Sequence, residues 1–294
     1  MALYVQTNTS SINSQRMLSR STRQIDTSYQ RLASGMRINS AKDDAAGLQI
    51  SNRMTSQING LTQGNRNAND GISMCQVTEG ALDEVTNMLQ RIRTLAIQSA
   101  NGTNSSAERI AINEEVQQLA TEIKRIGTDT SFGGTLKVLG PNAGSTVFQV
   151  GSNAYETISL TMKSMSTLAT ITAAVTVNAN VTPNITLSIG TTLSNVTVTS
   201  ASASQKTIAF MSEIIRQVDS YRAELGAVQN RMESTISNQE NVIENVNDAR
   251  SRIRDVDYAV ETAAMTQQSI IQQASTTILA QANQKTQIAM NLLQ

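Results

Sequence analysis

Residues 225–263 read LGAVQNRMESTISNQENVIENVNDARSRIRDVDYAVETA, a stretch whose apolar residues recur every seven positions. The first set of positions is Leu225, Met232, Gln239, Val246, Ile253 and Val260. The second set, three residues further on, is Val228, Thr235, Val242, Ala249, Val256 and Ala263. This repeat predicts a coiled-coil helix with two polar interruptions, Gln239 and Thr235. A helix of roughly 50 residues or more, about 75 Å long, needs partner helices along its length.

The N-terminal part of the chain carries apolar stripes that can serve as those partners. Leu18, Ile25 and Leu32 repeat every seven residues. Two further apolar faces consist of Leu82, Val85, Leu89, Ile92 and Ala96, and of Ile112, Val116, Leu119, Ile123 and Ile126. Between these faces Asn101-Gly102-Thr103 predicts a turn, and Asn104 or Ser105 can cap the second helix. We expect an antiparallel helical hairpin that joins the C-terminal helix in a bundle.

The composition favours one elongated helical body over two or three compact domains, the alternative for 294 residues. Only two prolines, Pro141 and Pro183, interrupt the chain, so long helices can run through both ends. Aromatic residues make up 3% and Trp is absent, whereas compact cores commonly use aromatic side chains as large space-filling units. The predicted fold class is mainly α, a long antiparallel helical bundle or coiled coil formed by the N- and C-terminal segments.

The middle of the chain has a different texture, which predicts a small β-rich region. Residues 136–200 are rich in Thr, Val, Ser and Ile and poor in charge. After Phe132-Gly133-Gly134, apolar residues up to Leu160 predict short strands or hairpins on the flank of the helices. Thr186-Leu187-Ser188-Ile189 and Asn195-Val196-Thr197-Val198 alternate polar and aliphatic residues, which predicts a small outer β domain or, alternatively, an ordered loop.

The charges balance at 23 basic and 23 acidic residues, which disfavours binding to nucleic acid or to an anionic membrane. The first helical region is nevertheless locally basic. Its charged residues are Arg16, Arg20, Arg23, Arg31, Arg37 and Lys42, against Asp26 and Asp43. A solvated helix face is the simpler interpretation, and a complementary contact with a neighbouring subunit is the alternative.

The residue types required for common catalytic chemistry are missing. The chain has no His, which excludes His-based triads and His-Glu-x-x-His zinc motifs, and it has no Gly-x-x-x-x-Gly-Lys phosphate loop. The single Cys75 cannot form an internal disulfide and is expected to be a small buried apolar residue. The N-terminal segment has no apolar run long enough for a secretory signal or a membrane helix. We expect no enzyme activity, no cofactor, no metal and no membrane insertion.

Motifs near both ends resemble bacterial flagellin. The N-terminal part contains Gln30-Arg31-Leu32-Ala33-Ser34-Gly35, which continues to Gly47, followed by Arg66-Asn67-Ala68-Asn69-Asp70-Gly71-Ile72-Ser73. The C-terminal part contains Ala249-Arg250-Ser251-Arg252-Ile253-Arg254-Asp255 and Leu279-Ala280-Gln281-Ala282-Asn283-Gln284. Ser34 and Gly35 would permit a non-helical joint, after which Asn39 or Ser40 could cap the next helix.

The resemblance implies a subunit of a hollow helical filament that gives bacteria swimming motility. Residues 1–43 with 252–294 would form a terminal helical pair in the inner core, and 44–163 with 204–251 the surrounding helical shell. Residues 164–203 would be a variable surface region. The implied partners are further copies of the chain, a flagellar export chaperone, the filament cap and the hook-junction proteins. Type III export to an extracellular filament fits the missing secretory signal.

The terminal segments carry more apolar surface than one partner helix can cover, so their folding is expected to be coupled to polymerisation. The residues expected in the assembly core are Leu18, Ile25, Leu32, Val256, Val260, Ile271, Ile278 and Leu292. An ordinary intramolecular coiled coil is the alternative.

A second expected interaction site lies at residues 90–97, which resemble the flagellin stretch bound by the flagellin-sensing Toll-like receptor of animals. By motif position Arg91, Leu95 and Glu115 correspond to its contact residues, whereas Thr94 replaces an acidic residue common there. The same surface is expected to contact an adjacent subunit in the filament. Two other functions stay open at this point: a hook-filament junction protein, and a secreted coiled-coil adhesin or immune ligand. An enzyme is the third open alternative for the function.

Overall fold

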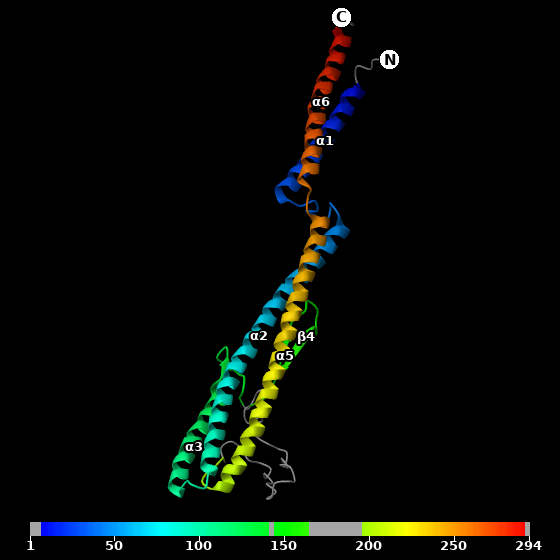
Figure 1. Ribbon diagram of the computed structural model, residues 1–294. Coiled ribbons are helices and arrows are strands. Elements are labelled where there is room, and N and C mark those ends of the chain that lie inside the picture. The colour runs from blue at the N-terminus through cyan, green and yellow to red at the C-terminus, as the bar shows by residue number, and fades with distance from the viewer. Residues whose placement is uncertain (1–6, 141–143, 165–195, 292–294) are drawn as a thin grey trace. The chain divides into compact units, whose positions relative to one another are not determined.

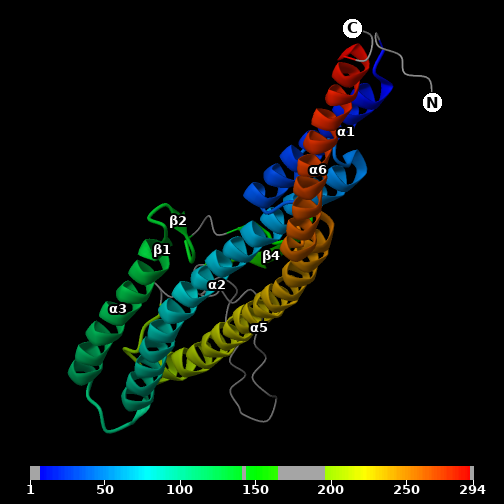
Figure 2. The same ribbon diagram turned by 90° about the horizontal axis from the view of Figure 1, so that it is seen from above.

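The computed structural model describes residues 7–140, 144–164 and 196–291, with side chains described up to residue 284. The helices in these ranges are α1 (Thr9–Ser34), α2 (Ala45–Ala100), α3 (Ser106–Asp129), α5 (Ala201–Arg254) and α6 (Tyr258–Asn291). The same ranges also contain two antiparallel hairpins (Figures 1 and 2). The predicted mainly α class with a small β region is therefore confirmed.

The chain divides into two compact units. The first consists of Met1–Asn59 with Val242–Gln294, and the second of Gly60–Asn241. Helices α2 and α5 each contribute residues to both units. The first unit therefore joins the two ends of the chain, and the second is one continuous stretch.

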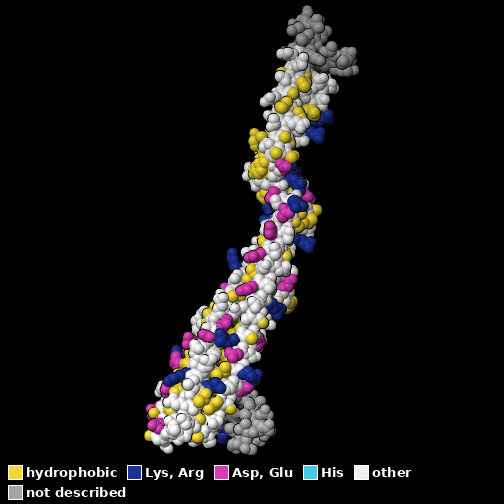
Figure 3. Space-filling model, in the orientation of Figure 1, with side chains coloured by type: hydrophobic (Ala, Val, Ile, Leu, Met, Phe, Trp, Pro, Cys, Tyr) yellow, Lys and Arg dark blue, Asp and Glu magenta, His cyan; other side chains and the backbone are white. Residues whose placement is uncertain are grey.

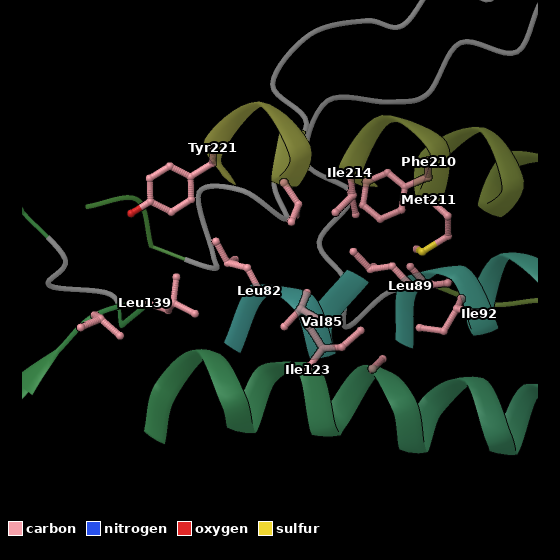
Figure 4. Close-up of a cluster of buried hydrophobic side chains, with 14 of the residues drawn as sticks. Leu82, Val85, Leu89, Ile92, Ile123, Leu139, Phe210, Met211, Ile214 and Tyr221 are labelled. Atoms are coloured by element: carbon pink, nitrogen blue, oxygen red, sulfur yellow. The ribbon is translucent and has the colours of Figure 1, made fainter. Parts of the chain in front are cut away.

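The second unit is built on a three-helix apolar core. The predicted α2 face is confirmed, because Leu82, Val85, Leu89 and Ile92 are fully buried. Figure 4 shows these side chains between α3, which contributes Ile123, and α5. The buried residues of α5 in this core are Phe210, Met211, Ile214, Val218, Tyr221 and Leu225. Burial of about ten large apolar side chains, each stabilising by about 2 kcal/mol, holds these three helices together.

The connection between α2 and α3 follows the predicted helical hairpin. Of the two candidate caps, Ser105 is the N-cap of α3, and its side chain and that of Glu108 form a reciprocal capping box. Asn104 has another role, since its Nδ2 donates a hydrogen bond to the Gln98 carbonyl at 2.6 Å. The Glu108 pKa lies below its usual value because the Ser105 backbone N–H, and then its hydroxyl, donate to the carboxylate.

The predicted short hairpins are also present. β1 (Ser131–Phe132) pairs with β2 (Leu136–Lys137), and between them Gly133 and Gly134 have φ values of 62° and 79° that other residues rarely adopt. β3 (Ser145–Gln149) pairs with β4 (Thr157–Thr161), which buries every second residue. Both β4 residues that face inward, Ile158 and Leu160, are at most 3% exposed.

The strand expected at Asn195–Val198 was wrong for its described residues, which carry no strand assignment. Val196 and Val198 are instead buried in the helical core, and their carbonyls accept hydrogen bonds from Gln117 Nε2 at 2.5 Å and Ser99 Oγ at 2.6 Å. Helix side chains thus replace a neighbouring strand as hydrogen-bond partners. The other expected strand, Thr186–Ile189, lies outside the described residues.

The sequence predicted a single helix over the whole heptad stripe, and this prediction was wrong. Helix α5 ends at Arg254 and α6 begins at Tyr258. Val256 lies in the break, where its N–H donates to the Gly35 carbonyl at 3.1 Å. Asp257 restarts the helix by accepting hydrogen bonds from the N–H groups of Ala259 and Val260. A tertiary hydrogen bond and a local cap therefore override the seven-residue repeat.

The non-helical joint predicted at Ser34-Gly35 is present. Helix α1 ends at Ser34, and Gly35 has the left-handed φ of 70° that suits glycine. The expected caps of the next helix, Asn39 and Ser40, were wrong. Their N–H groups donate to Asp43 instead, while Asp44 accepts from the first turn of α2.

Candidate assembly surface of the terminal helices

Helices α1 and α6 lie side by side and antiparallel in the first unit (Figures 1 and 2). Ser28 Oγ donates to Glu261 Oε1 at 2.6 Å, and Ser21 Oγ donates to Gln268 Oε1 at 3.0 Å. Near the end of the pair, Ser11 Oγ donates to Asn283 Oδ1 at 3.0 Å. From the first contact to the second, seven residues back along α1 correspond to seven residues forward along α6, and from the second to the third, ten residues of α1 correspond to fifteen of α6, so the pair is antiparallel.

The buried face of α1 is polar, which the sequence reasoning missed. All four buried residues of this helix are serines, namely Ser11, Ser14, Ser21 and Ser28. Three of them are seven residues apart and alternate with the predicted stripe of Leu18, Ile25 and Leu32, which is only half-buried. Small side chains let two helix backbones approach closely. The seven-residue spacing of the serines was the available signal.

The facing side of α6 is equally small or polar. Ser275 and Ala282 are buried, and Glu261 keeps only 13% of its side chain exposed. Arg31 Nη1 lies 3.6 Å from Glu261 Oε2, so the carboxylate that accepts from Ser28 also has a cationic partner. We call this α1–α6 interface of serines, Glu261, Gln268, Ser275 and Ala282 the polar seam.

Large apolar side chains of both helices point to solvent instead (Figure 3). On α1, Ile12 is 58% exposed and Tyr29 59%. On α6, Val260 is 64% exposed, Ile270 60% and Ile278 54%. A shallow depression follows one face of α6 and is lined by Ala259, Thr262, Ala263, Thr266, Gln267, Ile270 and Ile271. This combination of polar seam and exposed apolar residues reverses the usual arrangement of a helix pair.

The expected assembly-core residues fall into three groups. Leu18, Ile25, Leu32, Val256 and Ile271 are half-buried within the unit. Val260 and Ile278 are exposed. Leu292 lies outside the described residues.

The expected receptor residues lie in the second unit and differ in exposure. Arg91 Nη2 lies 2.7 Å from Glu115 Oε1, and their side chains are 55% and 45% exposed, so the pair joins α2 to α3 at the surface. Leu95 is only 3% exposed and belongs to the apolar core. Thr94 is exposed, and its hydroxyl donates to the Gln90 carbonyl of the same helix.

Neither metal chemistry nor a reactive thiol is evident in the part of the chain that the structure describes. There, no three Cys, Asp or Glu side chains gather as a metal site, and no helix is both long and apolar enough to cross a membrane. Cys75 is fully buried as expected, and burial raises its thiol pKa to about 11.

Two family models match the chain, the bacterial flagellin N-terminal helical region at residues 5–142 and the C-terminal helical region at 208–293. The chain is 38% identical to polar flagellin F of Vibrio parahaemolyticus over 377 residues, which cover 100% of both chains. With flagellin B of Vibrio anguillarum it shares 40% identity over 376 residues and the same full coverage.

Identity is higher but local with the B-type flagellin of Pseudomonas aeruginosa, at 57% over 169 residues that cover 58% of this chain and 34% of that protein. A solved structure described as a flagellar hook-associated protein from Vibrio parahaemolyticus covers 72% of this chain and 100% of its own, with 13% identity and a TM-score of 0.56. That likeness shows the fold alone. From the family matches and the full-length relatives it follows that this chain belongs to the bacterial flagellins, the structural subunits that polymerise into the flagellar filament.

Proposed function

We propose that the exposed apolar faces of α1 and α6 form the contacts between subunits in the inner part of the filament. The observation that carries this proposal is the reversal of the helix pair, with serines in the seam and Val260, Ile270 and Ile278 in water. Each of these side chains stabilises an interface by about 2 kcal/mol when a neighbour covers it. Leu18, Ile25, Leu32, Val256, Ile271 and Leu292 complete the proposed assembly core.

A paired substitution tests this surface directly. Val260→Gln with Ile270→Gln removes two exposed apolar side chains and keeps the helix-forming character of α6. We expect a normal circular dichroism spectrum and a loss of filaments in electron micrographs. The matched control is Gln273→Ala with Gln281→Ala, two exposed polar positions of the same helix. Filaments of normal length from the first variant would contradict the proposal.

Folding of the terminal helices is coupled to polymerisation in this proposal, because the pair alone leaves its apolar faces in water. Removal of the last twenty residues is expected to abolish filaments and leave the second unit folded. Electron microscopy of the purified truncated protein checks this outcome. Filaments assembled from it would exclude the C-terminal segment from the assembly core.

The inner core is assigned to residues 1–43 with 252–294, and the shell to residues 44–163 with 204–251. Residues 164–203 form the variable outer region of this scheme, which is supported by the interval between the two family matches at 142 and 208. Replacement of residues 168–192 by a Gly-Ser linker of equal length is expected to leave filament formation intact. Loss of filaments would place this segment in the assembly contacts.

The pair formed by Arg91 and Glu115 is the proposed receptor and subunit contact of the second unit. Both side chains are half-exposed and lie on adjacent helices, and Leu95 supports the surface from within the core. Arg91→Ala is expected to weaken activation of the animal Toll-like receptor by monomers, whereas Arg53→Ala, another exposed arginine of α2, is the control. An unchanged dose response for Arg91→Ala would remove the assignment.

The filament is extracellular in this proposal, and the subunit leaves the cell by type III export. An export chaperone, the filament cap and the hook-junction proteins are the proposed partners before and during assembly, since the same apolar faces need cover at each stage. Immunoblots of culture medium from strains with and without the export apparatus test the route. Equal amounts of subunit in both media would contradict it.

A further inference from the structure

Three exposed arginines on α1 form a ridge that has no ion-pair partner among the described residues. Arg16, Arg20 and Arg23 are three and four residues apart, so they share one face of the helix. Arg16 donates to Asn13 and Arg23 to Ser19, and within the described residues none of the three forms an ion pair. We call these three residues the basic ridge.

An opposite ridge runs along α5. Glu233, Glu240 and Glu244 are exposed and are seven and four residues apart, which places them on one face of the helix. Across the described ranges, no salt bridge involves any of them, whereas the nearby Asp248 pairs with Arg252 at 2.7 Å. The sequence between Arg231 and Arg250 contains no basic residue. We call the three glutamates the acidic ridge.

Each ridge works against the helix that carries it. Arg16 and Arg20 are like charges at a spacing of four residues, and so are Glu240 and Glu244. Such pairs destabilise an isolated helix weakly, and salt bridges to opposite charges would reverse the effect. Asp248 and Arg252, two exposed charges further along α5, do form such a pair. The uncompensated ridges therefore point to a partner outside the chain.

The two ridges are opposite in charge, and two charges of each ridge can be matched in spacing in either of two alternative registers. Arg16 and Arg23 are separated by about 10 Å along α1, and Glu233 and Glu240 are separated by the same distance along α5. Arg16 and Arg20 likewise match Glu240 and Glu244, at about 6 Å. Arginine forks suit carboxylates in particular, because two parallel N–H groups can reach both oxygens.

We propose that the basic ridge of one copy docks against the acidic ridge of a neighbouring copy during filament assembly. A second copy is the fitting partner because the chain polymerises with itself and every copy carries both ridges. A contact between two different patches is head-to-tail, and when its rotation does not close a ring it propagates as an open helical polymer. The opposed charges also steer approaching subunits.

Charge reversal in separate chains tests the contact. The first variant carries Arg16→Glu and Arg23→Glu, and the second carries Glu233→Arg and Glu240→Arg. Elongation of wild-type filament seeds, followed by light scattering, is expected to slow at least tenfold for either variant alone. An equal mixture of the two variants restores opposite charges at each contact, and so does a chain that carries all four substitutions. Both are expected to regain most of the wild-type elongation rate on seeds assembled from the same protein.

The control is Arg53→Glu with Arg66→Glu, which changes the net charge equally at two exposed arginines of α2. Rates of the ridge variants within twofold of this control, or a mixture no faster than its components, would overturn the proposal. Circular dichroism verifies folding, and Arg16→Gln with Arg23→Gln replaces the reversal if it fails to fold. Each assay includes wild-type subunits added to wild-type seeds as a positive control. If those do not elongate either, the failure lies in self-assembly itself and not in the contact between the ridges.

Discussion

Helices α2, α3 and α5 bury Leu89, Ile123, Phe210 and similar large side chains against one another. Helices α1 and α6 bury serines, Ser275 and Ala282, and leave valine, isoleucine and tyrosine in water. The first arrangement is stable by itself because it removes apolar surface from water within one chain. The second leaves large apolar side chains exposed. In our proposal the first region is complete before assembly, and the second is completed by neighbouring subunits.

The largest expected effect on stability comes from replacing a leucine, and it differs between the two regions. Leu89→Ala is expected to destabilise the second unit by about 3 kcal/mol, because it leaves a cavity in a closed core. Leu18→Ala in the half-buried stripe of α1 should leave that unit unchanged. Labelling of Cys75 at pH 8 reports opening of the second unit, since the native thiol is buried and its pKa is about 11. If both variants accelerated the labelling of Cys75 equally, the contrast between the two regions would be wrong.

The next largest effect on stability is expected at Gly64, where helix α2 lies close to the backbone of Val150 in the second unit. A Cβ on Gly64 would lie 1.8 Å from the Val150 carbonyl oxygen, which also accepts from Gln239 Nε2 at 2.8 Å. Gly64→Ala is therefore expected to cost about 1–3 kcal/mol through overpacking. The control Gly80→Ala meets nothing within 4 Å and should stabilise the helix by about 1 kcal/mol. Urea titrations measure both, and the same sign for both variants would contradict this reading.

The polar seam predicts a smaller and local effect. Ser21→Leu places a large side chain where the hydroxyl now donates to Gln268, and we expect about 1–2 kcal/mol of lost pairing. Hydrogen exchange should accelerate in α6 near Gln268 and stay unchanged in α3. Ser19→Leu, at an exposed position of α1, is the control. If Ser21→Leu instead protected α6, the seam would be an ordinary apolar interface.

The smallest effect concerns the cap of α3. Ser105→Ala is expected to cost about 1 kcal/mol. Because the Glu108 pKa is lowered in the folded chain, its contribution is present above the unfolded pKa and is lost as pH falls through the folded value. The stability difference between wild type and Glu108→Ala should therefore shrink as pH falls below about 4.3, the ordinary pKa of Glu. A difference that persists at pH 2 would mean that the carboxylate is not the stabilising group.

Several structural features were readable from residues alone. The apolar faces of α2 and α3 follow from helical spacing, and the cap of α3 was narrowed to Asn104 or Ser105, of which the structure has Ser105. Gln239 was visible only as an interruption of the heptad. Its function, an amide that donates to the Val150 carbonyl, depends on a hairpin 89 residues away in the chain. Asp44 and Asp257 were equally invisible as caps, because each acts at a break that tertiary contacts position.

Local pattern therefore determined that the chain is helical towards both ends, that short hairpins follow α3, and that its family is flagellin, since periodicity and motifs are properties of neighbouring residues. For α1, by contrast, the tertiary structure decided which face of the helix is buried. Leucines at seven-residue spacing predict a seam, yet in α1 the serines beside them lie inward, because their hydroxyls find partners on α6 and small side chains allow close packing. Burial depends on what another segment presents, and no single helix contains that information.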